Sequence, residues 1–99
     1  GFVESVYEKA LAYEITKNGL RVAQQERLIV RYDGVIVGDF RVDLMVEESL
    51  LVEVKAVAEI CKSHKLQLGN YLKASRLKLG LLVNFGGKSV QLARKVNGF

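Results

Sequence analysis

Two acidic side chains and a lysine near the middle of the chain have types and spacing suited to metal-assisted chemistry. Glu53 and Lys55 are separated by one residue, and Asp43 lies earlier in the chain. Residues two apart in a β-strand point to the same face, so Glu53 and Lys55 share a face if they lie in a strand. Paired carboxylates can hold a divalent cation, and a neighbouring ammonium can orient or deprotonate water.

The three side chains need a hairpin to bring them together, and the sequence predicts one. If Val46 lies opposite Leu50 across the turn Glu47-Glu48-Ser49, antiparallel pairing puts Asp43 directly opposite Glu53, with Cβ atoms about 5 Å apart. The same register puts Arg41 opposite Lys55.

Facing carboxylates repel each other, and the apolar residues around Glu53 would limit its hydration. A divalent cation, Mg²⁺ or Mn²⁺, would compensate the pair. The alternative from these residues alone is a surface strand in which Glu and Lys pair across rungs. Asp39 is an alternative to Asp43, but its offset from the turn fits this register less well.

Apolar spacing and turn residues predict the elements around this hairpin. The predicted elements are a helix over residues 2–18, strands over 27–32, 35–46 and 50–57, a helix over 63–76 with Ser63 as its N-cap, and strands over 79–85 and 89–94. This order predicts one domain with a mixed sheet flanked by helices, an α/β fold of the mixed α+β kind. A helical crossover would make the third and fourth strands parallel.

Three segments carry a resemblance to a known family. Residues 41–44 (Arg-Val-Asp-Leu) and 52–55 (Val-Glu-Val-Lys) resemble the D…(D/E)-x-K core of the PD-(D/E)XK nuclease superfamily. Residues 1–7 (Gly-Phe-Val-Glu-Ser-Val-Tyr) resemble the signature of its GxxExxY protein branch. The resemblance covers essentially the whole chain. It implies a restriction-endonuclease-like αβββαβ core and metal-dependent hydrolysis of phosphodiester bonds in nucleic acid.

The resemblance also implies roles for single residues. Asp43 and Glu53 would hold Mg²⁺ or Mn²⁺, Lys55 would assist the attacking water, and Glu4 would add a carboxylate from the first helix. Gln67 and Tyr71 match a Q-x-x-x-Y element of the second helix in some members, and they share a helix face.

The chain departs from the family pattern in two places. Val42 stands where the superfamily has a proline before the first aspartate. Relatives of the GxxExxY branch carry another helix before the Gly-x-x-Glu-x-x-Tyr segment, so the resemblance implies that a preceding helix is missing from residues 1–99. Glu4 would then lie in a frayed first turn, and activity or metal affinity would be weakened.

Charge is divided unevenly along the chain. Residues 1–50 hold six Lys and Arg against nine Asp and Glu, whereas residues 51–99 hold nine against two. A basic half can attract a polyanion and an acidic half can collect a metal ion, although ordinary solvated surface also explains the division. The candidates for nucleic-acid contact are Tyr71, His64, Lys62, Lys65, Lys73 and Arg76. The expected partner is a nucleic acid, DNA in the first instance, and the resemblance leaves a homodimer open.

Cysteine content and hydropathy bear on the compartment. Cys61 is the only cysteine, so no disulfide framework is expected, and zinc is rejected because further Cys or His ligands are lacking. We expect Cys61 in the core. No apolar run approaches the roughly 18 residues of a membrane span, and no secretory signal opens the chain, so a soluble cytoplasmic protein without a membrane partner is expected.

Two other functions remain compatible with the sequence. One is a non-catalytic nucleic-acid-binding or protein-interaction module that retains the nuclease fold. The other is an enzyme of the same fold that acts on a phosphate compound other than nucleic acid.

Overall fold

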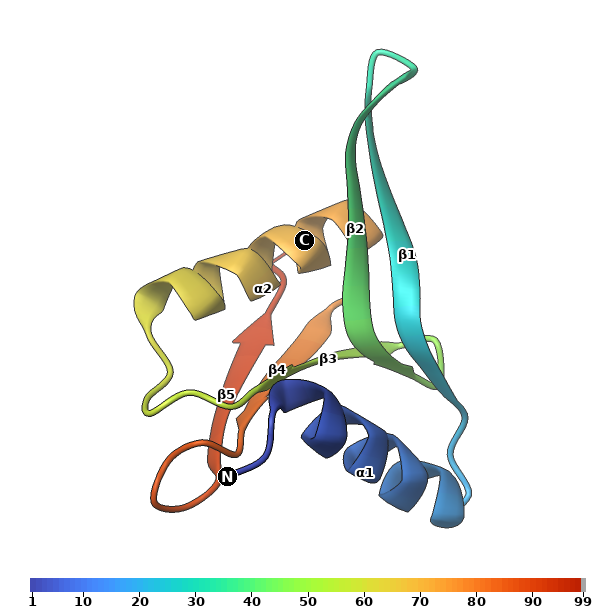
Figure 1. Ribbon diagram of the computed structural model, residues 1–99. Helices are drawn as coiled ribbons and strands as arrows, with labels where there is room; N and C mark the ends of the chain where they lie inside the picture. The colour runs from blue at the N-terminus through green and yellow to red at the C-terminus, as the bar shows by residue number, and fades with distance from the viewer. Residues whose placement is uncertain (99) are drawn as a thin grey trace.

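The described part of the protein is a mixed five-stranded sheet with one helix on each face (Figure 1). The computed structural model describes residues 1–98. In chain order the elements are α1 (Glu4–Lys17), β1 (Val22–Tyr32), β2 (Val35–Val46), β3 (Leu50–Lys55), α2 (Lys62–Ser75), β4 (Leu79–Asn84) and β5 (Gln91–Val96). The strands lie in the order β1-β2-β3-β4-β5, with β3 and β4 parallel and the other neighbours antiparallel. The predicted fold class and the parallel pairing of β3 with β4 are confirmed.

Two apolar clusters hold the helices to the sheet. Ala12 of α1 packs with Val52 on one face, and Leu68 of α2 packs with Leu51 on the other. Because side chains alternate along a strand, Glu53 points to the same face as Leu51, toward α2. Neither helix has the length and apolar character that crossing a membrane requires in the part of the chain that is described.

β1 is longer than the sequence predicted. It was expected to begin at Arg27, but it begins at Val22, and its added residues pair with the second half of β2. The added segment includes Gln24, Gln25 and Glu26, which are exposed. An edge strand needs few apolar residues, so these positions gave no strand pattern. The other predicted boundaries lie within two residues of the observed ones.

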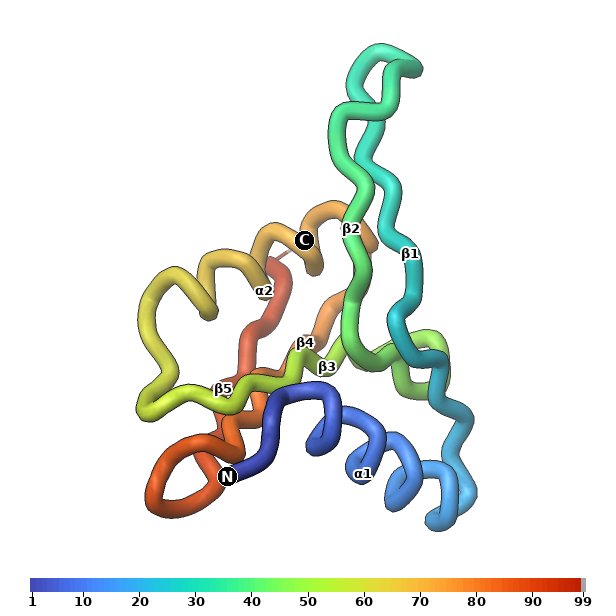
Figure 2. The backbone as a smooth tube through the Cα atoms, in the orientation of Figure 1, coloured from blue at the N-terminus to red at the C-terminus, as the bar shows by residue number. Residues whose placement is uncertain are grey.

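β1 and β2 form a long hairpin that projects beyond the rest of the sheet (Figures 1 and 2). Its tip is the predicted tight turn, in which Asp33 and Gly34 have φ angles of 52° and 77°. Both angles are left-handed, as a two-residue hairpin turn of this kind requires. The pairing slips between Val30, which is opposite Gly38, and Arg31, which is opposite Ile36.

The start of α2 corrects two predictions about Cys61 and Ser63. Cys61 is exposed rather than in the core, and it occupies the N-cap position that was predicted for Ser63. The Cys61 backbone N–H donates to His64 Nδ1 at 3.1 Å, which forms one half of a capping box. The cysteine therefore lies at a solvated helix start instead of filling space between apolar elements.

Candidate functional site

Asp43 and Glu53 meet where the pairing of β2 with β3 ends. The ladder runs from Val46↔Leu50 to Leu44↔Val52, as the predicted register requires. At the next rung the Asp43 backbone N–H donates to Glu53 Oε2 at 2.7 Å, and the Val54 N–H donates to Asp43 Oδ2 at 2.8 Å. The two carboxylates thus replace the main-chain acceptors of the ladder.

The strands separate beyond this rung, so the expected facing of Arg41 and Lys55 is wrong. The pairing of β2 with β3 does not extend to these two residues. Arg41 instead turns to β1, where its Nη1 donates to the backbone oxygen of Gln25 at 3.3 Å. The physical reason is the insertion of two side chains between the strands, which leaves too wide a gap for further main-chain bonds.

Burial dominates the electrostatics of Glu53, which is only 5% exposed. The pKa of Glu53 is raised to about 8, mainly by burial and further by the negative charge of Asp43. The hydrogen bond from the Asp43 N–H and the positive charge of Lys55 act in the opposite direction and lower this pKa. The Lys55 charge and the Asp43 N–H bond therefore do not offset the cost of burying an ionised Glu53 carboxylate beside Asp43. At neutral pH, without a bound cation, the pair holds a proton.

A third carboxylate, that of Glu8, approaches the pair from α1. Glu8 is 7% exposed, and burial raises its pKa, against a hydrogen bond from Gln25 that lowers it and with the nearby Asp43 carboxylate raising it further. Gln25 Nε2 donates to Glu8 Oε1 at 2.7 Å and to Asp43 Oδ1 at 3.3 Å. Gln25 therefore links the first helix to the carboxylate pair.

Neither Glu8 nor Gln25 was among the predicted site residues. Glu8 follows Glu4 by one helical turn, and that spacing could have marked both as lying on one helix face. Gln25 has a φ of 54°, a left-handed conformation in the interior of β1. Nothing in the sequence indicates it, because glutamine is not a residue that favours this conformation.

Glu4 is half-buried at the first position of α1, after an N-cap residue, Val3, that makes no side-chain cap bond. Its negative charge contributes to the raised pKa of Glu8. Within residues 1–98, no three histidine, cysteine, aspartate or glutamate side chains come together closely enough to hold one metal ion. The structure thus brings Asp43 and Glu53 together but leaves Glu4 outside a shared ligand group.

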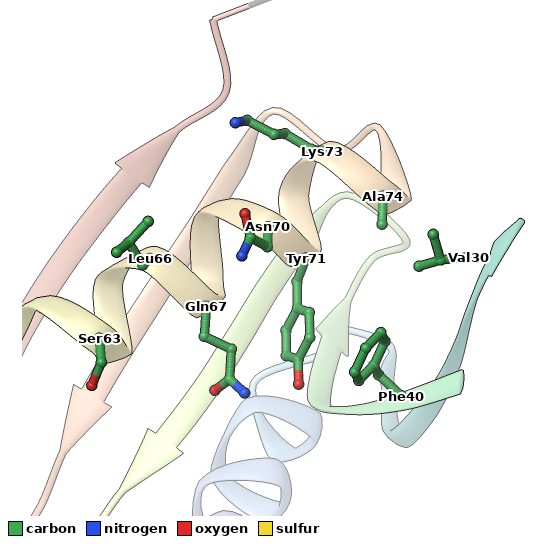
Figure 3. Close-up of a pocket in the computed structure, with 9 residues that line it drawn as sticks. All are labelled: Val30, Phe40, Ser63, Leu66, Gln67, Asn70, Tyr71, Lys73 and Ala74. Carbon is green, nitrogen blue, oxygen red and sulfur yellow. The ribbon is translucent and has the colours of Figure 1, made fainter. Parts of the chain in front are cut away.

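Tyr71 of α2 interacts electrostatically with the pair, and Gln67 lies one helical turn before it. Tyr71 is 8% exposed, and burial raises its pKa, as do the charges of Glu53 and Asp43. The hydroxyl therefore lies within the electrostatic reach of both carboxylates. Figure 3 shows the Gln67 and Tyr71 side chains extending from α2 in the same direction. Their shared face is as the four-residue spacing predicted.

The remaining predicted residues lie along α2, away from the carboxylates. His64 is engaged by the Cys61 N–H at the helix start. The cationic candidates are exposed on α2 or at its C-cap; they are Lys62, Lys65, Lys73 and Arg76. Exposure leaves their side chains available for contact with a polyanion.

Lys55 is half-buried beside Glu53, and Asn84 holds the chain that follows it. Asn84 lies alongside Lys55 in the parallel pair and is fully buried. Its Oδ1 accepts from Val57 N at 3.0 Å and from Gly86 N at 3.1 Å, while its Nδ2 donates to Val57 O at 2.9 Å. Asn84 therefore fixes the loop that leaves the site.

We expect Asn84→Leu to lower the free energy of unfolding by about 2–4 kcal/mol, because it removes the fully buried amide that bonds the part-buried main-chain groups of Val57 and Gly86. Denaturant unfolding followed by circular dichroism measures the change. The matched control is Asn70→Ala on the exposed side of α2, where a change within about 0.5 kcal/mol is expected. Equal losses of unfolding free energy in the two variants would contradict the role of Asn84 in fixing this loop.

Comparisons with known proteins give the same picture of the fold. A family model described as the PD-(D/E)XK nuclease superfamily matches residues 1–96. The crystal structure of the protein SSO0001 superimposes with a TM-score of 0.75 at 17% identity, covering 96% of this chain and 50% of that one. An alkaline exonuclease from Laribacter hongkongensis superimposes with a TM-score of 0.67 at 12% identity, covering 95% and 56%. The chain thus spans about half the length of each. No curated protein matches the sequence.

Proposed function

The chain belongs to the PD-(D/E)XK nuclease superfamily, and from this membership and the carboxylate pair we propose that it is a metal-dependent nuclease that hydrolyses phosphodiester bonds of nucleic acid, DNA in the first instance. The observation that carries the proposal is the pair of hydrogen bonds from the Asp43 N–H to Glu53 and from the Val54 N–H to Asp43, which hold a buried and a half-buried carboxylate side by side. The match of Gly1, Glu4 and Tyr7 to the GxxExxY branch is part of the proposal. We also propose that the protein resides in a reducing cytoplasm, which suits the free thiol of Cys61, and that it forms a homodimer.

The donor set of the pair fits Mg²⁺ or Mn²⁺. Main-chain amides engage one oxygen of each carboxylate, and this leaves a second oxygen on each for a cation. The second Asp43 oxygen accepts a 3.3 Å bond from Gln25. Magnesium keeps several of its waters in protein sites, so two carboxylates and a substrate phosphate suffice without a third protein ligand. The proton that burial places on Glu53 would leave when a cation binds.

A bound divalent cation would polarise the phosphate and lower the pKa of a water molecule. Lys55 lies beside Glu53, close enough for its charge to lower the pKa of that carboxyl. Its ammonium would orient the attacking water or stabilise the negative charge that develops on the phosphate oxygens. Gln67 would hydrogen-bond the water or the phosphate, and Glu4 would act on the outer waters of the site.

The residues of α2 would hold the substrate. The exposed cations described above, Lys62, Lys65, Lys73 and Arg76, would contact phosphates. Such contacts are independent of sequence and weaken with salt. His64 already accepts a bond through Nδ1, so its remaining ring nitrogen would be the one that donates to a phosphate.

A cleavage assay tests the proposal directly. We expect cleavage of single-stranded DNA, duplex DNA or RNA with magnesium or manganese, and none with a chelator. Substrate binding without cleavage, in the presence of metal, would favour the non-catalytic module. Cleavage that survives the chelator would overturn the metal-dependent mechanism.

A further inference from the structure

An open groove runs between α2 and the β1–β2 hairpin (Figure 3). Its volume is about 640 Å³, within the roughly 300–1,000 Å³ that small-molecule sites occupy. Val30 and Phe40 line it from the hairpin, while Leu66, Tyr71 and Ala74 line it from α2. The walls are therefore largely apolar, on a protein whose α2 carries exposed cations.

Phe40 presents an aromatic ring to this groove. The ring lies 5.6 Å from that of Tyr71, at an interplanar angle of 47°, and Phe40 remains 43% exposed. A Cβ added at Gly38 would lie 2.7 Å from the Phe40 ring, so the glycine makes room for the ring. Tyr71 and Gly38 thus fix the ring on two sides, and its remaining surface is open.

Polar groups lie along the α2 side of the same groove. Gln67 and Asn70 line it, and neither side-chain amide has a hydrogen-bond partner within residues 1–98. Lys73 also lines it and brings an exposed positive charge. A flat apolar surface, two free amides and one cation together match a ligand with a planar ring, polar ring edges and a phosphate.

Tyr71 lines the groove and also interacts electrostatically with the carboxylate pair. Its ring packs against the ring of Phe40 on the groove side. Burial and the charges of Glu53 and Asp43 raise the pKa of its hydroxyl. Tyr71 is therefore shared between the groove and the electrostatic surroundings of the carboxylate pair.

We propose that this groove holds an unpaired nucleobase of a single-stranded or frayed nucleic-acid substrate, stacked on Phe40, with Gln67 and Asn70 at the base edge and Lys73 at a phosphate. The proposal rests on the proposed nuclease function and specifies its substrate. A base within a duplex has both faces covered by its neighbours, so only an unpaired base can offer its ring to Phe40. The cation and the basic second half of the chain favour a polyanion over a neutral apolar ligand.

The test compares the affinities of fluorescein-labelled oligothymidylate, an abasic strand of equal length, and a blunt duplex, all with chelator so that no strand is cut. We expect the wild type to bind oligothymidylate more tightly than the abasic strand. Phe40→Leu should weaken oligothymidylate binding about tenfold, with little effect on the abasic strand or the duplex. Phe40→Leu keeps an apolar side chain against Tyr71, so the fold should survive. The matched control is Tyr13→Leu on α1, an aromatic that is 67% exposed and distant in sequence from the groove.

Two results would overturn the proposal. One is equal weakening on all three probes, because that indicates a general loss of phosphate contacts or of the fold. The other is unchanged oligothymidylate affinity in Phe40→Leu, because that removes the stacking contact. Cleavage by the wild type with magnesium is measured separately, so its absence counts against the nuclease function while the binding comparison still decides the groove.

Discussion

Glu53→Gln is expected to reduce cleavage on the order of 10³-fold, because it removes one of two carboxylates that would hold the cation and each 1.36 kcal/mol of lost stabilisation costs tenfold in rate. Single-turnover rates with saturating magnesium measure the loss. The control is Glu59→Gln, in the exposed loop after β3, which should cleave at the wild-type rate. Cleavage by the Glu53→Gln variant at the wild-type rate would contradict the assignment of Glu53 to the active site.

The same substitution should stabilise the protein in chelator. The pKa of Glu53 is raised to about 8 in the folded state from 4.5, mainly by burial. The folded state therefore holds a proton that the unfolded state has lost, and wild-type stability falls as pH rises from about 4.5 to 8. Glutamine resembles the protonated acid, and its Oε1 can still accept from the Asp43 N–H.

We therefore expect Glu53→Gln to unfold at higher denaturant than the wild type at pH 7–8, by on the order of 2 kcal/mol, and to lose most of the difference at pH 4. Denaturant titrations at both pH values give the comparison. A variant that is less stable than the wild type at both would contradict the raised pKa. Lower activity combined with higher stability would separate a chemical role from a folding defect.

Lys55→Ala is expected to lower the cleavage rate by roughly 10²–10⁴-fold while leaving the affinity for magnesium within a few-fold, because the lysine acts on the water or the developing charge and does not hold the cation. Rates come from the cleavage assay, and calorimetric titration gives the metal affinity. Lys88→Ala, in the exposed turn between β4 and β5, is the matched control.

Lys55→Arg distinguishes the two roles of the lysine. Arginine keeps the positive charge but does not deprotonate, so it would rescue charge stabilisation and fail to rescue proton transfer. A Lys55→Ala protein that cleaves like the wild type would contradict both roles.

The contacts that the sequence could predict are those set by short-range rules. The three-residue turn determines which residues of β2 and β3 face each other, so the amino-acid order alone was enough to predict that Asp43 and Glu53 meet just beyond the last paired rung. Helical spacing likewise put Gln67 and Tyr71 on one face of α2. These predictions needed only the local periodicity of a hairpin and a helix.

The contacts that could not be predicted join segments far apart in the chain. Glu8 meets Asp43 through Gln25, whose left-handed backbone has no sequence signal. Asn84 bonds Val57 across the parallel pair, and that contact depends on how the crossover packs. Tertiary packing decides such positions, and a single sequence records it only weakly.

At the end of the β2–β3 ladder, the Asp43 and Glu53 carboxylates accept hydrogen bonds from main-chain amides. They therefore have a structural role in addition to the metal-binding role proposed for them. A related protein without nuclease activity would still need an oxygen acceptor at both positions to satisfy these main-chain amides. Acidic residues there are consequently no proof of an active enzyme in other chains of this architecture. Under the proposed function, an amide in place of either acid would lower the cleavage rate and would still offer an oxygen acceptor to the main-chain amides.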